Sequence, residues 1–545
     1  MIKQLVFFLI STLSFNIFAQ CDNNTTNKIM ILGDSWAFFS WQGDSYNENL
    51  DRFGFTDIRA KSNGDISVNG TTANNFFTDN TRRNAVKQFL LQNTDIEYIQ
   101  FSLGGNDFLG NWNKNMDSIQ VFNLIQQVYV SIKNGIDSLN KYKPGVKILF
   151  SGYDYPNFSE TVGTLTPQAL QELHPFYSLW NGMGQPTPIE INTITKIFTI
   201  IIEDSLSVIE NVSFVNNLGL MQWHYGQNTA LTVAPFGTYQ EYTAPLPFGF
   251  LNYPSPLDAL NFNGLDAFHL NNNAYELFIK NHFQEYYWSE LRNADLTVSA
   301  IDTNYNATIS ENTIDKSKLS IGTSNNIENK ILLTFNTDTL PNDYIKEASI
   351  FLQLKNVNGQ NLISEELTIE IKENFFGSNL ENEIEDLNNL NDAENIACTY
   401  GSLSQEYHWL RIDIPSNLLQ HINKEGLTQF RLSYKNISET NRNINFYNNN
   451  IYLDLKFGTE PIDTNVSLIS LKNEVCTIYP NPTKNFLHLI TNERIQKINI
   501  SDRNGKHIIS KENSKFINIE HLNKGLYFIE IKTKNTTSKL TFIKE

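Results

Sequence analysis

Cysteine is scarce in this chain of 545 residues, which contains only Cys21, Cys398 and Cys476. The three are far apart and odd in number, so their spacing indicates neither a disulfide framework nor a zinc site. No other spacing indicates a bound metal or cofactor, and we expect none. The fold must therefore depend on its hydrophobic cores.

Positive charge is also in short supply. The chain carries 41 Lys and Arg against 58 Asp and Glu, which gives a formal net charge of −17. Such a chain lacks the electrostatic attraction that nucleic-acid binders use. Anionic membrane surfaces are disfavoured for the same reason. We expect no nucleic-acid partner.

Long apolar runs are absent beyond the N-terminus. Lys3 precedes an apolar run over residues 5–18, which is too short to span a bilayer comfortably. With a cleavage site near Ala19, this pattern predicts a secretory signal over residues 1–20. A buried helix is disfavoured because the run lacks helical periodicity, and lipidation of Cys21 is disfavoured by the Gln before it. No later run predicts a transmembrane segment.

The first half of the chain has an alternating α/β pattern. The length predicts two to four domains, and we place the first at residues 21–293. Apolar periodicity predicts helices over 121–139 and 274–287. Strands alternating with helices predict a parallel sheet with helices on both faces. The apolar runs that predict buried strands are 28–32, 96–103, 146–150 and part of 208–215.

A long aromatic stretch over residues 218–262 interrupts this pattern. It begins after a predicted strand, so it should cover the carboxyl edge of the sheet. Loops of this length are usually functional or disordered, and the aromatic residues argue against disorder. Trp223 and Tyr225, together with Trp36, are candidate ligand contacts. It is equally open that the rings of the stretch only pack it onto the body.

The second half of the chain is rich in predicted strands. Residues 294–460 alternate with period two between turn residues, which predicts a β-sandwich. The acidic stretch 381–394 is expected to be a solvated loop. Residues 461–472 resemble a linker. Residues 473–545 form a second β-rich unit, in which Asn504-Gly505 predicts a hairpin.

Four short motifs follow one another along the first domain. Three of them come just after predicted strands, where parallel sheets place their sites. In order they are Ile31-Leu32-Gly33-Asp34-Ser35, Asn69-Gly70-Thr71-Thr72, Gly104-Gly105-Asn106-Asp107 and Asp266-Ala267-Phe268-His269.

These motifs contain every group needed for acyl transfer through a serine ester. Ser35 supplies a nucleophile and His269 a base, which Asp266 can orient. The backbone N–H groups of Ser35 and Gly70 and the Asn106 amide can donate to an oxyanion. Each residue alone has a commoner interpretation, as a helix cap, a turn residue or a chance Asp-x-x-His pair. All four motifs in this order favour catalysis.

The order of the four motifs and their residues resemble those of the SGNH, or GDSL, hydrolase family over residues 27–293. The resemblance implies a flavodoxin-like three-layer α/β/α fold and ester hydrolysis without a metal. It also implies the roles named above for Ser35, Gly70, Asn106 and His269, with Asp266 as the third member of the triad. Trp36 after the serine and the long stretch before Asp266 depart from many members, which leaves the substrate class open.

The C-terminal unit resembles the type A sorting domain of the type IX secretion system of Bacteroidetes. The matching residues are Tyr479-Pro480-Asn481-Pro482, the Asn-Gly-Lys hairpin at 504–506 and Gly525-Leu526-Tyr527-Phe528. The resemblance implies that residues 473–545 engage this machinery, and that the protein passes through the periplasm to the medium or the cell surface. An ordinary small β-sandwich is the alternative. The middle domain is loosely similar to modules that accompany secreted hydrolases, some of them carbohydrate-binding, and a spacer role is equally open.

The sequence therefore predicts a secreted serine esterase, with an acylated carbohydrate as the expected substrate. A lipase or short-chain esterase of the same fold is one alternative. A catalytically silent surface binding protein is another, against which the intact set of motifs argues.

Overall fold

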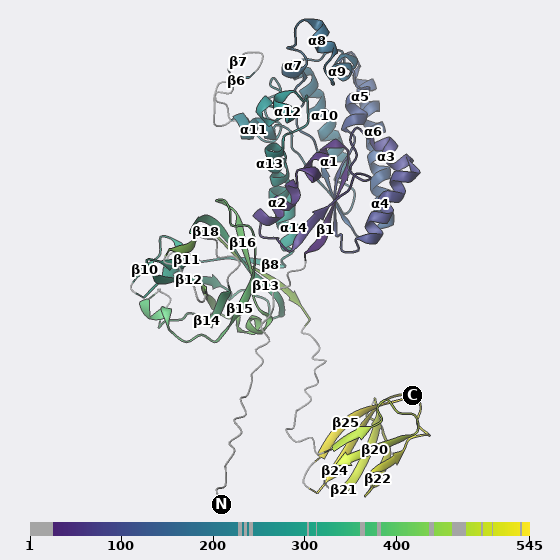
Figure 1. The fold of residues 1–545 in the computed structure, drawn as a ribbon, viewed down its shortest axis with the longest axis vertical. Coiled ribbons are helices and arrows are strands. Elements are labelled where there is room, and N and C mark those ends of the chain that lie inside the picture. Colours follow the sequence, from purple (N-terminus) through teal and green to yellow (C-terminus); the bar gives the residue numbers. More distant parts are fainter. Residues whose placement is uncertain are drawn as a thin grey trace, which may run out of the picture. The chain divides into compact units, whose positions relative to one another are not determined.

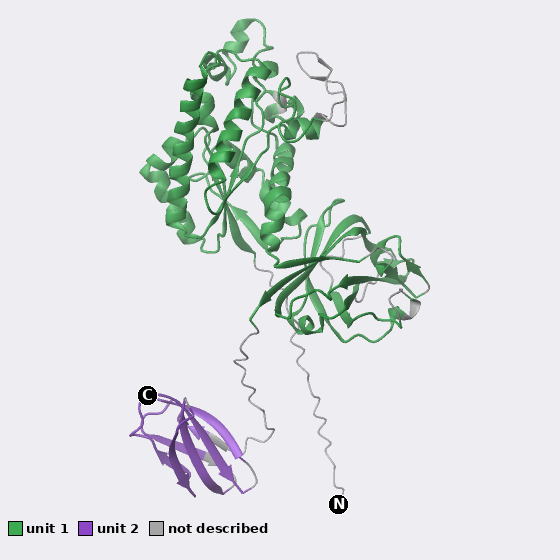
Figure 2. Ribbon diagram, turned by 180° about the vertical axis from the view of Figure 1, so that it is seen from behind, with its two compact units in different colours: residues 1–460 green, residues 461–545 purple. Residues whose placement is uncertain are grey.

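The structure is a computed structural model with two compact units, residues 1–460 and 461–545, shown in Figure 2. The predicted signal over residues 1–20 and the predicted linker over 461–472 lie outside the described residues. The structure describes residues 25–226, 232–233, 237–238, 244–301, 305–311, 313–359, 366–378, 383–434, 441–459, 476–491, 494–503, 505–534 and 537–545.

The first unit begins with a five-stranded sheet in the order β2-β1-β3-β4-β5, in which all neighbours are parallel. The predicted strands are confirmed, whereas β2 escapes prediction because it is a short edge strand with two charged residues. In β1, side chains alternate between two separate cores, Ile29 and Ile31 on one face and Met30 and Leu32 on the other. The strands are β1 (Thr26–Gly33), β2 (Ile58–Lys61), β3 (Tyr98–Ser102), β4 (Lys147–Ser151) and β5 (Val212–Val215).

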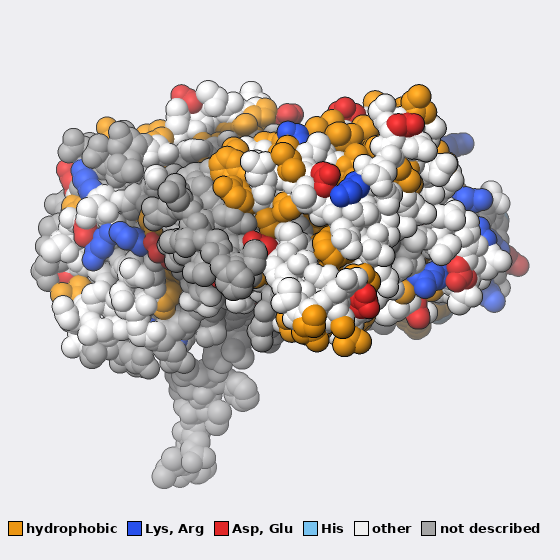
Figure 3. Space-filling model, turned by 90° about the horizontal axis from the view of Figure 1, so that it is seen from above, with side chains coloured by type: hydrophobic (Ala, Val, Ile, Leu, Met, Phe, Trp, Pro, Cys, Tyr) orange, Lys and Arg blue, Asp and Glu red, His pale blue; other side chains and the backbone are white. Residues whose placement is uncertain are grey.

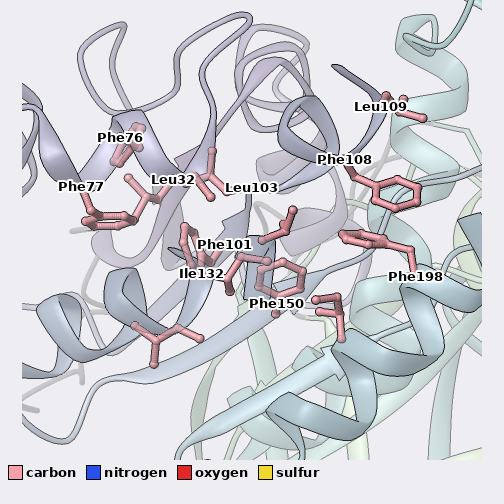
Figure 4. Close-up of a cluster of buried hydrophobic side chains, with 14 of the residues drawn as sticks. Leu32, Phe76, Phe77, Phe101, Leu103, Phe108, Leu109, Ile132, Phe150 and Phe198 are labelled. Atoms are coloured by element: carbon pink, nitrogen blue, oxygen red, sulfur yellow. The ribbon is translucent and has the colours of Figure 1, made fainter. Parts of the chain in front are cut away.

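Helices cover both faces of this sheet, as predicted (Figure 1). Figure 4 shows part of the core on the face of Met30 and Leu32, where Phe101 and Phe150 of the sheet meet Phe77 and Ile132. The helices of this face are α3 (Ala73–Thr78), α4 (Asn80–Gln92), α5 (Gly105–Asn111), α6 (Ser118–Tyr142) and α10 (Pro188–Leu206). Those of the other face are α1 (Ser35–Gln42), α2 (Ser45–Arg52), α11 (Leu220–Gly226), α13 (Asn272–His282), a π-helix (Phe283–Tyr287) and α14 (Trp288–Arg292).

The connections at the carboxyl edge of the sheet are longer and less regular. They contain α7 (Phe158–Thr161), α8 (Gln168–Glu172), α9 (Tyr177–Gly182), α12 (Asn261–Gly264) and the two-residue strands β6 (Thr232–Val233) and β7 (Gly237–Thr238). Helix α11 corrects the expectation that all of 218–262 is loop. The Asp154 carboxylate caps it, accepting from the N–H groups of Gly219 and Met221 at 2.7 Å each. A capping residue so distant in the sequence cannot be recognised from the local pattern.

The rest of the first unit is the predicted β-sandwich. Its strands pair antiparallel around one hydrophobic core, and the β12–β17 pairing closes the sheet on itself. Cys398 in β15 is disulfide-bonded, which the spacing of the cysteines does not predict. The strands are β8 (Leu296–Ser299), β9 (Ala307–Ile309), β10 (Ile314–Asp315), β11 (Leu319–Ser324), β12 (Ile327–Asn336), β13 (Tyr344–Asn358), β14 (Leu367–Glu373), β15 (Ala393–Tyr400), β16 (Trp409–Asp413), β17 (Leu427–Tyr434) and β18 (Arg442–Gly458).

The sandwich packs directly against the α/β part of the same unit. Trp288 of α14 lies 4.7 Å from Trp409 and 5.2 Å from Phe351, measured between ring centroids. Arg411 donates to Asp57 at 2.8 Å. Buried aromatic rings and an ion pair thus cross the predicted boundary at residue 293, so the two parts are not separated by a free linker.

The second unit is a small two-sheet β-structure with its own core. Its sheets have the orders β19-β20-β23 and β22-β21-β24-β25. The predicted hairpin joins β21 to β22, and Gly505 has the left-handed φ of 78° that such a turn requires. The strands are β19 (Cys476–Tyr479), β20 (Phe486–Thr491), β21 (Ile495–Asp502), β22 (His507–Glu512), β23 (Phe516–Asn518), β24 (Gly525–Thr533) and β25 (Thr537–Lys544).

None of the helices in the described ranges is both long and apolar enough to cross a membrane.

Candidate active site

Ser35, His269 and Asp266 form one continuous chain of hydrogen bonds. Ser35 Oγ lies 2.8 Å from His269 Nε2, and His269 Nδ1 lies 2.9 Å from Asp266 Oδ2. A carboxylate only accepts, so Nδ1 carries the proton and Nε2 accepts from the Ser35 hydroxyl. Asp266 is itself fixed, because its Oδ1 accepts from the N–H groups of Phe268 and His269 at 3.0 and 2.9 Å.

Ser35 is the first residue of α1, directly after β1. Gly33 is required before it, because a Cβ there would lie 2.0 Å from the Ser102 carbonyl oxygen on β3. Asp34 caps the helix by accepting from Trp36 N–H at 3.0 Å. This sharp strand-to-helix turn places the Ser35 hydroxyl at the carboxyl edge of the sheet, with its own N–H at a helix N-terminus.

The two predicted oxyanion loops adjoin this turn. Val68 N–H donates to the Gly33 carbonyl at 2.9 Å, which holds the Gly70 loop beside β1. Asn106 Nδ2 donates to the Thr71 carbonyl at 3.0 Å, which fixes the orientation of the amide. Gly70 is exposed and has a left-handed φ of 70°. Among the described residues, the N–H groups of Ser35 and Gly70 donate to no acceptor.

Two residues that the sequence analysis does not single out connect these loops. The Asp107 carboxylate accepts from Ala73 N–H at 2.6 Å, which joins the Asn106 loop to the start of α3. The Tyr153 hydroxyl donates to Asp34 at 2.6 Å and accepts from Gly105 N–H at 3.1 Å. Tyr153 follows β4 at the carboxyl edge, where ligand sites of parallel sheets gather, and this position is the signal that could have found it.

The Asp34 carboxyl has an unusual environment. It is fully buried beneath Ser35, and this burial raises its pKa to about 7, although the hydrogen bonds from Tyr153 and Trp36 act in the opposite direction. Burial also raises the pKa of the Tyr153 hydroxyl well above its usual value. The Tyr153 hydroxyl thus connects the nucleophile turn to the Asn106 loop through hydrogen bonds to Asp34 and Gly105.

Two other histidines near this edge have different surroundings. His174 Nε2 donates to the Leu265 carbonyl at 2.9 Å, and its Nδ1 accepts from Phe176 N–H, so both nitrogens are engaged in holding loops. Burial lowers the pKa of His224 to about 4, with a contribution from Lys280. Among the described residues, neither forms a hydrogen bond with Ser35, whereas His269 contacts both the serine and a carboxylate.

The three residues predicted from sequence as substrate contacts differ in how far they are buried. The Trp36 side chain is 3% exposed and packs against Tyr153 and Phe278, which argues against a contact between its indole and substrate. Trp223 and Tyr225 are half-buried on α11, and Tyr225 packs against the core around α13. Of the other aromatic residues of the stretch, Phe236, Tyr239 and Tyr242 lie outside the described residues.

The arrangement provides a nucleophile, a base with an orienting carboxylate, and a cluster of N–H donors at one edge. This is the set of groups that forms and hydrolyses a serine ester. Within the described residues, no group of three or more His, Cys, Asp or Glu side chains is placed to hold a metal ion.

Comparison with protein families identifies the C-terminal unit. Residues 477–545 match the family described as a secretion system C-terminal sorting domain. That part of the chain is a secretion sorting domain, as its motifs predict. Comparison with curated proteins gives no match.

Solved structures similar to the chain include two proteins named as lipases and one named as an aryl esterase. An extracellular lipase from Streptomyces rimosus is 12% identical, with 48% of this chain and 99% of the lipase covered and a TM-score of 0.26. A lipase from a goat rumen metagenome is 12% identical, with 48% and 98% covered and a TM-score of 0.26. An aryl esterase from M. smegmatis is 12% identical, with 49% and 99% covered and a TM-score of 0.26.

Proposed function

We propose that the protein is an exported serine esterase of the SGNH type that cleaves carboxylic esters through an acyl-enzyme. The observation that carries this proposal is the unbroken hydrogen-bond chain from Ser35 through His269 to Asp266. The order of the four motifs and the placement of the N–H donors around Ser35 support it further.

In the first half of the reaction, Ser35 Oγ attacks the acyl carbon while His269 Nε2 takes its proton. Asp266 holds the imidazole in the required tautomer and stabilises the imidazolium that forms. The carbonyl oxygen becomes an oxyanion, which accepts from the N–H groups of Ser35 and Gly70 and from the Asn106 amide. His269 then protonates the departing alcohol, which leaves an acyl group on Ser35.

In the second half, water replaces the alcohol. His269 removes a proton from the water as it attacks the acyl carbon, and the same three donors hold the second oxyanion. Collapse of this intermediate breaks the bond to Ser35 Oγ, which regains its proton from His269, and the carboxylic acid departs. No redox partner is needed, since all the electron pairs remain with the oxygen and carbon atoms of the ester and the water.

An acylated carbohydrate is the substrate class we favour. A groove of about 1090 Å³ lies beside Thr72 and Asp107, next to the loops of Gly70 and Asn106. Amides both donate and accept, so they suit the hydroxyl groups of a sugar. Those that line the groove are Asn74, Asn111, Gln120, Asn123, Gln126 and Gln127.

A lipid or other apolar ester is the second candidate, and exposed apolar side chains near His269 favour it. Leu173, Phe262 and Leu265 are 79%, 65% and 63% exposed. The His174 bond to Leu265 brings these segments together, and the Phe176 ring centroid lies 6.0 Å from that of His269. Figure 3 looks onto the end of the molecule where α8 lies, and apolar side chains form several patches there.

Hydrolysis of a chromogenic acetate ester tests the reaction, with the Ser35→Ala protein as the matched control. A surface binding protein would give equal, background rates for both proteins. A panel of acetate, butyrate and octanoate esters, together with acetylated xylan, then separates the substrate classes. Release of acetate from the glycan with poor octanoate cleavage supports the carbohydrate, and the reverse order supports the lipid.

We also propose that the sorting domain directs the protein through the type IX system to the medium or the cell surface. Removing residues 473–545 in the native host should leave active esterase in the periplasm, because the second unit has its own core and contributes none of the motifs. Wild-type levels of truncated protein in the medium would contradict the sorting role. Folded but inactive protein would contradict the proposed division into domains.

A further inference from the structure

A second groove lies where the α/β part of the first unit meets the sandwich. It has a volume of about 560 Å³ and is separate from the groove beside Asp107. The hydrolase side contributes Arg52, Glu276 and Lys280, and the sandwich contributes Gln353, Tyr407 and Trp409. We call it the junction groove. Because both parts supply side chains, it exists only while they are packed together.

Tyr407 is the most unusual residue of the junction groove. Its side chain is 56% exposed, and its backbone has a left-handed φ of 70°, which is rare and strained for an aromatic residue. The strain is held in place, because its N–H donates to the Leu354 carbonyl at 2.8 Å and its carbonyl accepts from Gln353 Nε2 at 3.3 Å. Such strain clusters at ligand sites.

The Tyr407 ring forms a flat platform with Tyr447. Their centroids are 5.4 Å apart, and the planes differ by 9°. One face of Tyr407 is covered by this partner, and its high exposure leaves the other face open. An apolar ring face in the open gains stability when a flat apolar surface covers it. The C–H face of a pyranose ring is such a surface.

Amide side chains line the junction groove around this platform. Gln353 and Gln405 come from the sandwich, and Asn273 and Gln284 come from the hydrolase. Each amide offers both donors and an acceptor, which matches the hydroxyl groups at the edge of a sugar ring. An apolar face bordered by hydroxyls is therefore the shape and chemistry that this groove complements.

Lys280 adds a positive charge that no carboxylate of the groove pairs with. Glu276 pairs with Arg52, and Glu406 is held by the Tyr447 hydroxyl, so neither forms an ion pair with Lys280 among the described residues. Lys280 is half-buried and has no ion pair or hydrogen bond among the described residues. Burial lowers its pKa, and the nearby Arg52 charge acts in the same direction. An anionic ligand here would compensate the partly desolvated ammonium.

We propose that the junction groove binds a sugar chain that carries carboxylate groups, with a pyranose ring on Tyr407 and a carboxylate at Lys280. This inference goes beyond ester hydrolysis and does not depend on it. The groove holds an acidic polysaccharide against both the sandwich and the α/β part, whether or not the chain cleaves it.

Binding is tested on the full chain carrying Ser35→Ala, so that no ester chemistry interferes. The probes are hexagalacturonate and the neutral cellohexaose, titrated by calorimetry. We expect hexagalacturonate to bind about tenfold more tightly, with an affinity that falls as salt screens the charge. Binding of neither probe overturns the proposal, and equal binding of both overturns the role of Lys280.

Two substitutions with matched controls locate the site. Tyr407→Gly removes the ring and relieves the left-handed strain, so the variant should fold, and it should weaken both probes about fivefold or more. Lys280→Met should weaken hexagalacturonate alone by about tenfold. The controls are Phe122→Ala, at a ring that is 52% exposed, and Lys87→Met. Unchanged binding in Tyr407→Gly, or equal losses in the controls, overturns the proposed site.

Discussion

Two histidines of the α/β part contact a serine hydroxyl, one at the edge of the sheet and one in the core at the end of α13. His269 Nε2 lies 2.8 Å from Ser35 Oγ, and His282 Nε2 lies 3.0 Å from Ser151 Oγ. The other nitrogen of His269 meets the Asp266 carboxylate, whereas that of His282 meets the Tyr46 hydroxyl at 2.8 Å. The side chain of His269 remains 12% exposed, and His282 is completely buried.

The difference shows what a histidine needs in order to act as a base toward serine. Burial without a compensating charge lowers the pKa of His282 to about 3, so it is too weak a base to activate a hydroxyl at neutral pH. Asp266 gives His269 an anionic partner that stabilises the imidazolium as it forms. A serine and a histidine within hydrogen-bond distance are therefore not sufficient. In the proposed mechanism, the Asp266 carboxylate and the partial exposure of His269 distinguish the catalytic pair from the buried pair of Ser151 and His282.

The largest difference between the two pairs should appear when each serine is replaced by alanine in a separate variant. Ser35→Ala should lower kcat by roughly 10⁶-fold, since loss of the nucleophile leaves only binding and oxyanion stabilisation. Ser151→Ala should keep most of the activity and instead lose about 1–3 kcal/mol of stability, because buried polar partners are left unpaired. Acetate hydrolysis and chemical denaturation measure the two. Comparable activity losses in both variants would make the two Ser–His pairs equivalent, against the proposal.

The next largest effect on activity should come from replacing the residue that contacts Nδ1 of each histidine. Asp266→Asn should lower kcat by about 10⁴-fold, because an amide can stabilise the wrong tautomer and cannot stabilise an imidazolium. Tyr46→Phe removes the corresponding partner of His282 and should affect stability alone. If Asp266→Asn retained activity within a few-fold of wild type, Asp266 would only hold the loop through the N–H groups of Phe268 and His269.

Asn106→Ala should have a smaller effect, about 10²–10³-fold on kcat with little change in KM. In the proposed mechanism, the Asn106 amide donates mainly to the oxyanion, which forms in the transition state and is absent from the bound ester. Steady-state kinetics with a soluble acetate ester separates kcat from KM. A change confined to KM would mean that Asn106 binds the ester in its ground state.

Much of the site could be predicted because its residues lie in short motifs at strand ends. Ile29 to Leu32 is a continuous apolar run, and such runs predict buried parallel strands, so the position of Ser35 at the carboxyl edge follows from the sequence. Asp266 and His269 are close enough in the chain to indicate their pairing. Spacing can predict these features because each depends on local residues.

The parts that escaped prediction depend on residues distant in the sequence. Tyr153 contacts Asp34 across 119 positions, and Arg411 contacts Asp57 across 354, and no local pattern marks either pair. Trp36 shows a different difficulty. It neighbours Ser35 in the chain, but successive side chains of a helix point about 100° apart, so Trp36 faces the core. Adjacency in sequence therefore gave no guide to adjacency at the site.

The smallest effect concerns the pH dependence of stability and tests the structural histidine alone. As pH falls below about 6.5, the unfolded chain protonates His282 while the folded chain keeps it neutral until about pH 3. The unfolded state then binds more protons, so the wild-type protein loses roughly 1.4 kcal/mol per pH unit over this window through His282. His282→Gln cannot titrate, so its stability deficit relative to wild type should shrink by about 3 kcal/mol between pH 7 and pH 4.

Wild type and His282→Gln must be compared, because other buried groups change the stability with pH in the opposite direction. Burial raises the pKa of Asp34 to about 7 and that of Asp154 to about 6. The folded protein therefore binds these two protons at a higher pH than the unfolded chain does. As pH falls toward about 4, both carboxyls raise the free energy of unfolding, which offsets the loss from His282. Both carboxyls are present in wild type and variant, so the difference between their denaturation midpoints isolates the histidine. Parallel pH profiles would show that His282 is accessible to protons in the folded state, and the contrast with His269 would then rest on the carboxylate alone.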